Sequence, residues 1–287
     1  MRERVTICEV SPRDGLQNEM SIVTTAEKIA LVDRLSACGL RYIEATSFVS
    51  PRAVPQLADG AEVLAGITRR PGVTYAALVP NLKGYEAARQ ARAGEVAVFA
   101  AASESFSRRN INCSIEESLA RYRDVCATAA RDGVPVRGYV SCIAACPYEG
   151  PVAPQRVAEV TAALFEMGCR EVSLGDTTGA ATPDQMGGLL RMMTARFPAD
   201  RLAGHFHDTR GQALACIEVA LAHGLRVFDA SVAGAGGCPF APGSAGNVAT
   251  EAVCDLLRRK GYETGIDRAA LSGASAFLSH ILGKVPS

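Results

Sequence analysis

The stretch Arg201-Leu202-Ala203-Gly204-His205-Phe206-His207-Asp208-Thr209 contains two of the four histidines of this chain, two positions apart. Its first residues are mostly apolar and predict a strand, in which residues i and i+2 point to the same face. Asp208 or Thr209 then ends the strand and can cap a following helix. Because polar rings are costly to bury without partners, two imidazoles on one face favour a metal site. A pair of merely hydrogen-bonded histidines is the ordinary alternative.

The same unit, a short apolar strand followed by a helical pattern, occurs eight times along the 287 residues. The predicted strands are Val5–Val10, Tyr42–Thr46, Thr74–Val79, Glu95–Ala100, Pro135–Val140, Glu171–Leu174, Leu202–His207 and Arg226–Ser231. The predicted helices are Thr25–Cys38, Gln56–Ile67, Leu82–Ala93, Ser114–Arg131, Ala153–Met167, Thr182–Arg196, Arg210–Ala222 and Asn247–Arg259, with one further C-terminal helix at Arg268–Leu282. Local signals support the helix ends: Ser114 and Glu117 resemble a capping box, and Pro183 follows Thr182 at a first turn.

This alternation predicts an α/β fold, a (β/α)8 or TIM barrel with an extra C-terminal helix, in a single domain over residues 1–287. A doubly wound open sheet is the alternative. It would require a glycine-rich phosphate turn after the first strand, and the sequence there, Ser11-Pro12-Arg13-Asp14-Gly15-Leu16, is not one.

Composition excludes several classes of protein. Apolar residues make up 48% of the chain, and thirty basic residues balance thirty acidic ones, which argues against a nucleic-acid binder. No apolar run is long enough to span a membrane, and the N-terminus runs directly into a strand, so no targeting peptide is expected. Ten scattered cysteines, with only Cys142 and Cys146 close together, indicate a reducing cytoplasm without disulfides.

Polar residues follow the predicted strands where a barrel forms its active site, at the C-terminal strand ends. They are Arg13 and Asp14 after the first strand, Glu44 on the second, Asp176 after the sixth, His205 and His207 on the seventh, and Cys238 and Asn247 in the glycine-rich loop Gly234–Asn247 after the eighth. Five of them also have an ordinary interpretation: a turn former for Asp14, a rim carboxylate for Glu44, a helix cap or loop anchor for Asp176, a helix cap for Asn247 and a buried thiol for Cys238. Their convergence on one end of the barrel favours a site.

Asp14, His205, His207 and Asn247 form a plausible ligand set of two oxygens and two nitrogens. Mixed carboxylate, amide and imidazole donors suit a hard divalent cation, Mg²⁺ or Mn²⁺, with open positions for a substrate. Structural zinc would more often recruit the cysteines.

Several motifs together resemble the hydroxymethylglutaryl-CoA lyase family. They are Ser11–Glu19, Ile43–Pro51, the histidine pair with Asp208-Thr209, the loop Gly236–Gly243, Asn110–Ser118 and Cys146–Gly150. The resemblance covers nearly the whole chain and implies cleavage of 3-hydroxy-3-methylglutaryl-CoA to acetyl-CoA and acetoacetate, in a homodimer. Nucleic-acid and membrane partners are not expected, because the charges balance and no long apolar run occurs. The resemblance also implies a metal held by Asp14, His205, His207 and Asn247, catalysis by Arg13, Asp14, His205 and Cys238, and substrate contacts from Arg13, Gln17, Glu44 and Asp176.

Other functions remain open at this point. Thr178, Arg210 and Met20 depart from the family pattern, so a lyase for a longer branched 3-hydroxyacyl-CoA is one alternative. A Claisen-type condensing enzyme would be expected to carry a long regulatory C-terminal domain. A metal-dependent hydrolase would normally place its histidine pair on the first strand. A non-enzymatic metal-binding protein would need neither Arg13 beside the ligands nor a cysteine in the glycine-rich loop.

Overall fold

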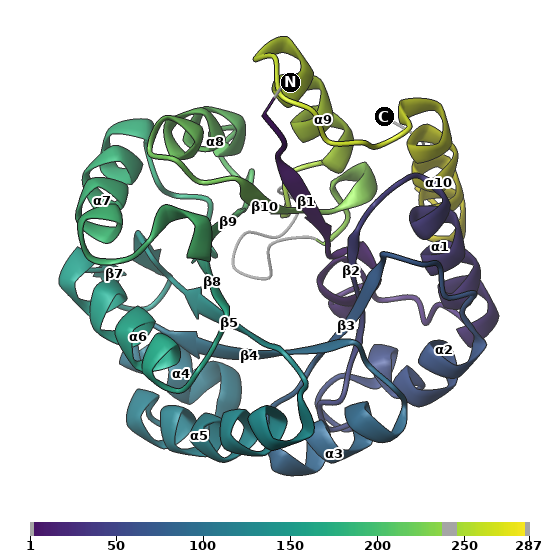
Figure 1. Ribbon diagram of the computed structural model, residues 1–287, viewed down its shortest axis with the longest axis horizontal. Coiled ribbons are helices and arrows are strands. Elements are labelled where there is room, and N and C mark those ends of the chain that lie inside the picture. The colour runs from purple at the N-terminus through teal and green to yellow at the C-terminus, as the bar shows by residue number, and fades with distance from the viewer. Residues whose placement is uncertain (1–2, 237–245, 285–287) are drawn as a thin grey trace.

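A computed structural model of the chain describes residues 3–236 and 246–284. Eight parallel strands close into a barrel in the order β1-β10-β9-β8-β5-β4-β3-β2 (Figure 1). The strands are β1 (Thr6–Glu9), β2 (Tyr42–Ser47), β3 (Thr74–Leu78), β4 (Glu95–Ala101), β5 (Val136–Ser141), β8 (Glu171–Asp176), β9 (Leu202–Phe206) and β10 (Val227–Ala230). The predicted barrel is therefore confirmed. Its strands are buried on both faces, which explains their nearly continuous apolar sequences.

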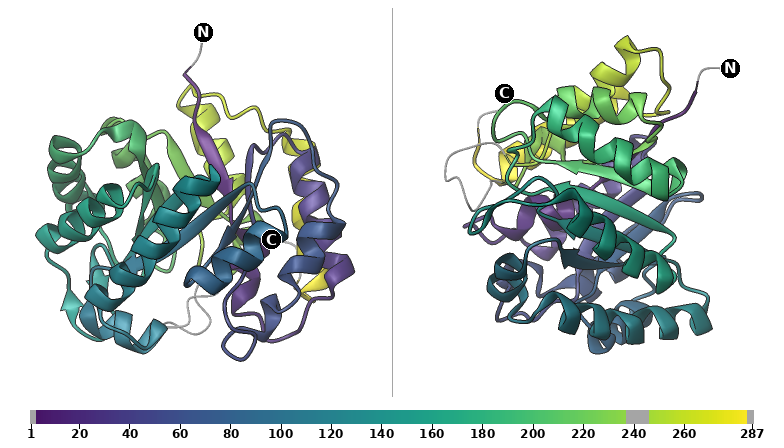
Figure 2. Two further views of the ribbon diagram at one scale, coloured as in Figure 1. Left: turned by 60° about the horizontal axis from the view of Figure 1, so that its bottom comes forward. Right: turned by 90° about the vertical axis from the view of Figure 1, so that its left-hand side faces the viewer.

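Helices surround the barrel and cover its outer face (Figures 1 and 2). They are α1 (Thr25–Ala37), α2 (Gly60–Gly66), α3 (Leu82–Gln90), α4 (Glu104–Ile111), α5 (Ile115–Asp132), α6 (Pro154–Glu166), α7 (Pro183–Arg196), α8 (Ala213–Ala222), α9 (Thr250–Arg259) and the predicted extra helix α10 (Arg268–Ile281). The capping box at Ser114 and Glu117 is present, and Thr182 caps α7 with Pro183 in its first turn. Among the described residues, no helix is long and apolar enough to cross a membrane.

Some elements differ from the predictions. Helix α4 and the two-stranded hairpin of β6 (Ala145–Cys146) and β7 (Gly150–Pro151) were not predicted. Helix α2 is shorter than expected because Gln56 lies in a 3₁₀ turn, Pro55–Leu57, where its side chain bonds backbone groups of Ser21 and Val23. Short elements of this kind depend on such tertiary contacts and have weak sequence patterns.

Helices α8 and α9 both begin three residues later than predicted. Before α8, Gly211 has a left-handed backbone (φ +67°), and the Asp208 carboxylate accepts a hydrogen bond from the N–H of Ala213. Asp208 thus anchors the start of this helix, as its position after the strand suggested. Before α9, the Asn247 side chain bonds Asp14 in the site described below. It does not cap the helix, whose N-cap is Ala249.

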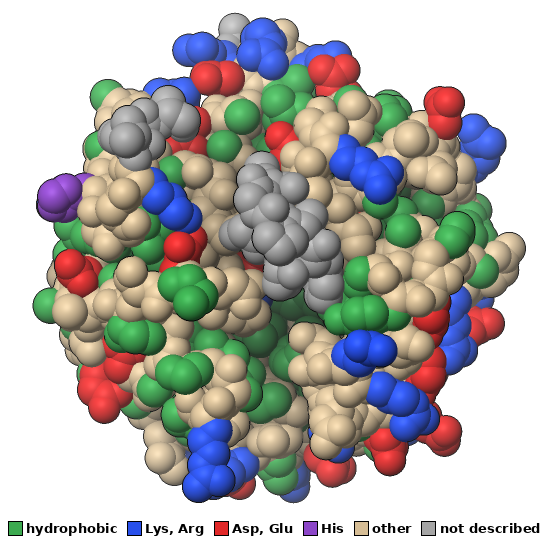
Figure 3. All heavy atoms as spheres, turned by 180° about the vertical axis from the view of Figure 1, so that it is seen from behind, with side chains coloured by type: hydrophobic (Ala, Val, Ile, Leu, Met, Phe, Trp, Pro, Cys, Tyr) green, Lys and Arg blue, Asp and Glu red, His purple; other side chains and the backbone are tan. Residues whose placement is uncertain are grey.

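All eight strands are parallel, so their carboxyl ends share one end of the barrel, here called the mouth. A π-helical turn, Ser11–Gly15, follows β1 directly and places two charged side chains there. Figure 3 views this end, where hydrophobic side chains surround a hollow near the centre.

Candidate metal centre and active site

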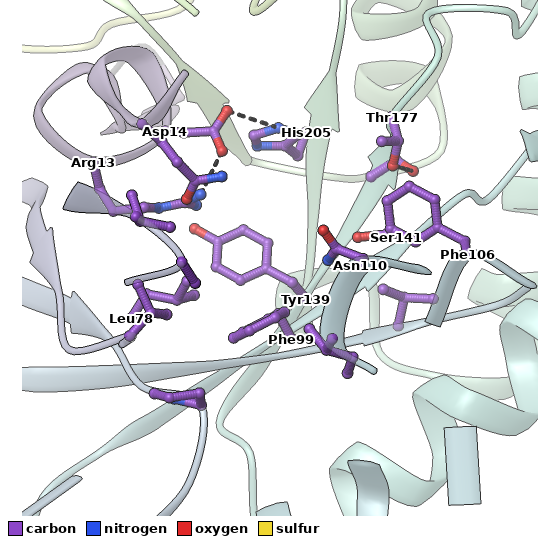
Figure 4. Close-up of a pocket in the computed structure, with 18 of the residues that line it drawn as sticks. Arg13, Asp14, Leu78, Phe99, Phe106, Asn110, Tyr139, Ser141, Thr177 and His205 are labelled. Carbon is purple, nitrogen blue, oxygen red and sulfur yellow. Dashed lines mark hydrogen bonds and ion pairs between the residues drawn. The ribbon is translucent and has the colours of Figure 1, made fainter. Parts of the chain in front are cut away.

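Asp14, His205 and His207 come together at the mouth. One potential ligand atom from each lies within 4.8 Å of the corresponding atoms of the other two. Asp14 is carried by the turn after β1, His205 by β9, and His207 follows β9 directly. Figure 4 shows Asp14 facing the His205 ring. The predicted convergence of these three residues is confirmed, in an arrangement that could hold a cation.

Asn247 lies against the same cluster. It pairs with His207 through a backbone bridge, and its Nδ2 donates to Asp14 Oδ2 at 2.8 Å and to the Ala235 carbonyl at 3.2 Å. The close approach requires glycine at position 236, where φ is +98° and a Cβ would lie 2.8 Å from Asn247 Nδ2. The helix-cap interpretation of Asn247 is therefore wrong, while its role as a fourth ligand stays a prediction.

The protonation states of this cluster suit a divalent cation. Burial by itself would raise the pKa of Asp14, but Arg13 and the two histidines more than offset it and hold that pKa well below its ordinary value. Burial and the neighbouring His205 lower the pKa of His207 to about 4, so its imidazole is neutral near pH 7. The Nδ1 atom of His207 is buried and has no hydrogen-bond partner among the described residues. A carboxylate, an amide oxygen and imidazole nitrogens form a mixed donor set that can hold a divalent cation such as Mg²⁺ or Mn²⁺.

Arg13 joins this cluster to the inside of the barrel. Its Nη1 donates to Asp14 Oδ1, and its Nη2 donates to Glu44 Oε2 at 2.8 Å. Burial would lower the pKa of Arg13, but the two carboxylates raise it above its ordinary range, so the guanidinium is always charged. Glu44 is fully buried and also accepts from the Tyr139 hydroxyl at 2.9 Å, so its interpretation as a rim carboxylate is wrong.

A second group of buried polar residues supports the first and was missed by sequence reasoning. Asp229 Oδ2 lies 3.1 Å from His205 Nδ1, and Arg137 Nη2 donates to Asp229 Oδ1 at 2.7 Å. Arg137 also donates to the Tyr139 hydroxyl at 2.7 Å, and the Tyr139 ring has guanidinium groups of Arg13 and Arg137 at 5.6 and 4.9 Å from its centroid. The available signal was a charged residue inside a strand that the fold buries on both faces.

A cavity of about 410 Å³ opens beside the metal-binding cluster. Figure 4 shows Arg13, Asp14 and His205 on one side of it, Tyr139 near its middle, and Phe99, Phe106 and Asn110 further along. Gln17 lines it, in keeping with its predicted substrate contact. The cavity thus has a charged end and an aromatic part, as a ligand with an anionic head and an apolar body would require.

The two remaining predicted residues have different outcomes. The Asp176 carboxylate accepts from the backbone N–H groups of Ala180 and Ala181, at 3.3 and 2.9 Å, and anchors the loop after β8. Its neighbours Gly175 and Thr177 line the cavity. Burial raises the pKa of Asp176, although these N–H groups oppose the shift. Cys238 lies outside the described residues.

Comparisons with known proteins show the family of this chain. Residues 4–278 match the HMGL-like family. The chain is 56% identical to the 3-hydroxy-3-isohexenylglutaryl-CoA/hydroxymethylglutaryl-CoA lyase of Pseudomonas aeruginosa, over 98% of this chain and 94% of that protein. It is 54% identical to the mitochondrial hydroxymethylglutaryl-CoA lyase of Gallus gallus, over 98% and 95%. The crystal structure of the HMG-CoA lyase from Brucella melitensis has a TM-score of 0.97 and 58% identity, covering 98% of this chain and all of the other. The chain therefore belongs to the HMGL-like family.

Proposed function

We propose that this protein is a divalent-metal-dependent lyase that cleaves 3-hydroxy-3-methylglutaryl-CoA to acetyl-CoA and acetoacetate. The observation that carries the proposal is Arg13, a permanently charged donor that joins the metal-binding cluster to the cavity. Family membership supports it, as does a related HMG-CoA lyase structure, at 38% identity and a TM-score of 0.94, that contains coenzyme A and 3-methylmalate.

The chemistry is a retro-Claisen cleavage. A bound Mg²⁺ or Mn²⁺ would lower the pKa of the tertiary hydroxyl of the substrate and fix its orientation. As that hydroxyl loses its proton to a base, the C2–C3 bond breaks and its electron pair moves onto the thioester oxygen as an enolate. Arg13 donates to this oxygen, where one well-placed donor contributes about 3–4 kcal/mol to the lowering of the barrier. The enolate carbon then takes up a proton, which gives acetyl-CoA.

The acid that supplies this last proton is either His205 or Cys238. If His205 binds the cation through Nε2, its Nδ1 already faces Asp229 at 3.1 Å, and no ring nitrogen remains for proton transfer. We therefore propose as the acid the Cys238 thiol, the candidate that the family resemblance implies. Gln17, which lines the cavity, completes the proposed substrate contacts, while Glu44 and Asp176 support the site by holding Arg13 and the loop after β8.

The test is acetoacetate release from 3-hydroxy-3-methylglutaryl-CoA with Mg²⁺, with Mn²⁺ and with excess EDTA, in the presence of a thiol reductant. We expect turnover with either cation and none with EDTA. Protein that binds Mn²⁺ but does not turn over this substrate would contradict the proposal. A parallel assay uses 3-hydroxy-3-isohexenylglutaryl-CoA, which the name of the Pseudomonas aeruginosa relative includes. We expect a lower kcat/KM for this longer substrate.

The expected homodimer rests on the family resemblance, and the expected cytoplasmic location rests on the scattered cysteines. Light scattering coupled to size-exclusion chromatography tests the oligomeric state, since a homodimer has twice the 30.1 kDa mass of the chain.

A further inference from the structure

His205 and Asp229 are opposite each other on adjacent strands. The parallel pairing of β9 and β10 places His205 against Asp229, and both side chains point into the barrel. The Asp229 side chain is fully buried, and the 3.1 Å contact joins its Oδ2 to Nδ1 of the imidazole. The other ring nitrogen, Nε2, is 3.9 Å from Asp14 Oδ2. One nitrogen thus faces the barrel interior and the other faces the metal-binding cluster.

The partners of Asp229 keep it a hydrogen-bond acceptor. Arg137 donates to both of its oxygens, at 2.7 and 3.1 Å, and the Ser173 hydroxyl donates to Oδ2 at 2.8 Å. A carboxylate paired with a fully buried guanidinium has no proton to give. The hydrogen bond to His205 therefore requires the proton to be on Nδ1.

His207 provides the contrast within the same cluster. Its Nδ1 has no partner among the described residues, so nothing in this part of the chain selects its tautomer. Among the described residues, the Nδ1 atom of His205 contacts a carboxylate, that of Asp229, whereas the Nδ1 atom of His207 contacts none. Ligating histidines in proteins commonly have such a carboxylate, which orients the ring and makes the free nitrogen more basic.

We propose that Asp229 is a positioning residue for the metal site, which holds the proton of His205 on Nδ1 and directs the Nε2 lone pair towards the cation. Arg137 and Ser173 hold Asp229 in place for this role. The inference rests on the proposed metal site, but its tautomer component can be tested without metal.

The first test is ¹⁵N NMR of the metal-free protein with labelled histidine at pH 8. The chain has only four histidines, so each signal can be assigned by replacing one histidine at a time with glutamine. We expect a proton on Nδ1 of His205. An unprotonated Nδ1 would overturn the proposal, and this measurement needs no Asp229 variant that folds poorly.

The second test compares Asp229→Ala with Glu95→Ala as a matched control. Glu95 is also buried in the barrel and paired with an arginine, Arg170, but it contacts neither histidine. We expect Asp229→Ala to weaken Mn²⁺ binding about 10–100-fold by calorimetry, the usual effect of losing such a partner. Glu95→Ala should leave Mn²⁺ affinity within about 3-fold, because it removes no contact of a ligand.

The outcomes separate the two proposals. If wild-type protein does not bind Mn²⁺, the proposed metal site fails. If wild-type protein binds it and Asp229→Ala binds equally well, the role of Asp229 fails alone. Equal weakening by both variants would mean that Asp229 acts only through barrel stability, which also overturns the inference.

Discussion

The two ends of the barrel interior both bury charged side chains, but they differ in how completely these side chains are paired. At the amino ends of the strands, Glu95 accepts two hydrogen bonds from Arg170 and one from Tyr42. Arg137, fully buried, is paired with both Glu171 and Asp229. Every one of these charges has an opposite charge in contact.

At the mouth, the buried polar atoms without a hydrogen-bond partner among the described residues include Arg13 Nε, Glu44 Oε1 and His207 Nδ1. Buried polar groups normally find partners, so such a group of exceptions marks a place where a ligand completes the network. We call the charged network at the amino ends of the strands the lower network and the one at the mouth the upper network. The comparison indicates that the lower network stabilises the barrel, while the upper network is left incomplete for binding.

The largest effect is expected from Asp14→Ala, which removes the only carboxylate of the metal-binding triad. We expect kcat/KM to fall by more than about 10³-fold, since a catalytic cation contributes several kcal/mol of transition-state stabilisation. Calorimetric titration with Mn²⁺ should show the loss of binding, with Glu95→Gln as the control that retains it. Unchanged Mn²⁺ affinity in Asp14→Ala would mean that the cation binds elsewhere.

Breaking the lower network should cost stability. In Arg137→Met the buried Asp229 loses its guanidinium and Glu171 loses its closer one, keeping only Arg170 at 3.7 Å. We expect the free energy of unfolding to fall by about 3–5 kcal/mol in urea titrations. Arg170→Met is the matched control, because the Arg170 side chain is 42% exposed and water can replace it in part. Equal losses of unfolding free energy in the two variants would show that the deeper burial of Arg137 adds nothing to stability.

Arg13→Gln tests the upper network without removing a proposed ligand. We expect kcat to fall about 10²–10³-fold, the usual effect of losing one donor to a developing oxyanion. Mn²⁺ affinity should stay within about 10-fold of wild type, because the triad and Asn247 remain. If Mn²⁺ binding is lost instead, Arg13 supports the metal site and does not act in the chemical step.

A pH effect should come from Glu9, a fully buried carboxyl at the mouth that contacts no cation among residues 3–236 and 246–284. It accepts from the Thr250 hydroxyl at 2.7 Å and from the N–H groups of Ser11 and Val232 at 3.0 Å. Burial, opposed by these hydrogen bonds, raises its pKa from 4.5 to about 7. The folded state therefore binds more protons than the unfolded state between these values, and stability from Glu9 is lost as pH rises through this window.

The measurement is urea unfolding of wild type and Glu9→Gln at pH 5 and pH 8. We expect wild type to lose about 3 kcal/mol relative to Glu9→Gln over this range, from the size of the shift. A difference between the two proteins that does not change with pH would place the pKa of Glu9 near its ordinary value.

Much of this molecule follows from local sequence. The strand and helix alternation predicts the barrel because apolar runs and helical patterns are local signals, and capping residues such as Ser114 and Thr182 mark their starts. The barrel in turn places Asp14, His205 and His207 at one mouth, since parallel strands bring their carboxyl ends together. The eight strands, the extra helix α10 and this cluster were all predictable for that reason.

Other features depend on contacts between distant segments. The ordinary interpretation of Glu44 as a rim carboxylate fails because the side chain is fully buried against Arg13, from the turn after β1, and Tyr139, from β5. Asp229 lies inside the predicted strand Arg226–Ser231 and had no predicted role, because only its register against His205 shows the contact. The sequence by itself determined which residues meet at the mouth, because strand direction decides that. Tertiary structure decided how they are paired, because hydrogen bonds between neighbouring strands depend on register and side-chain geometry that no local pattern encodes.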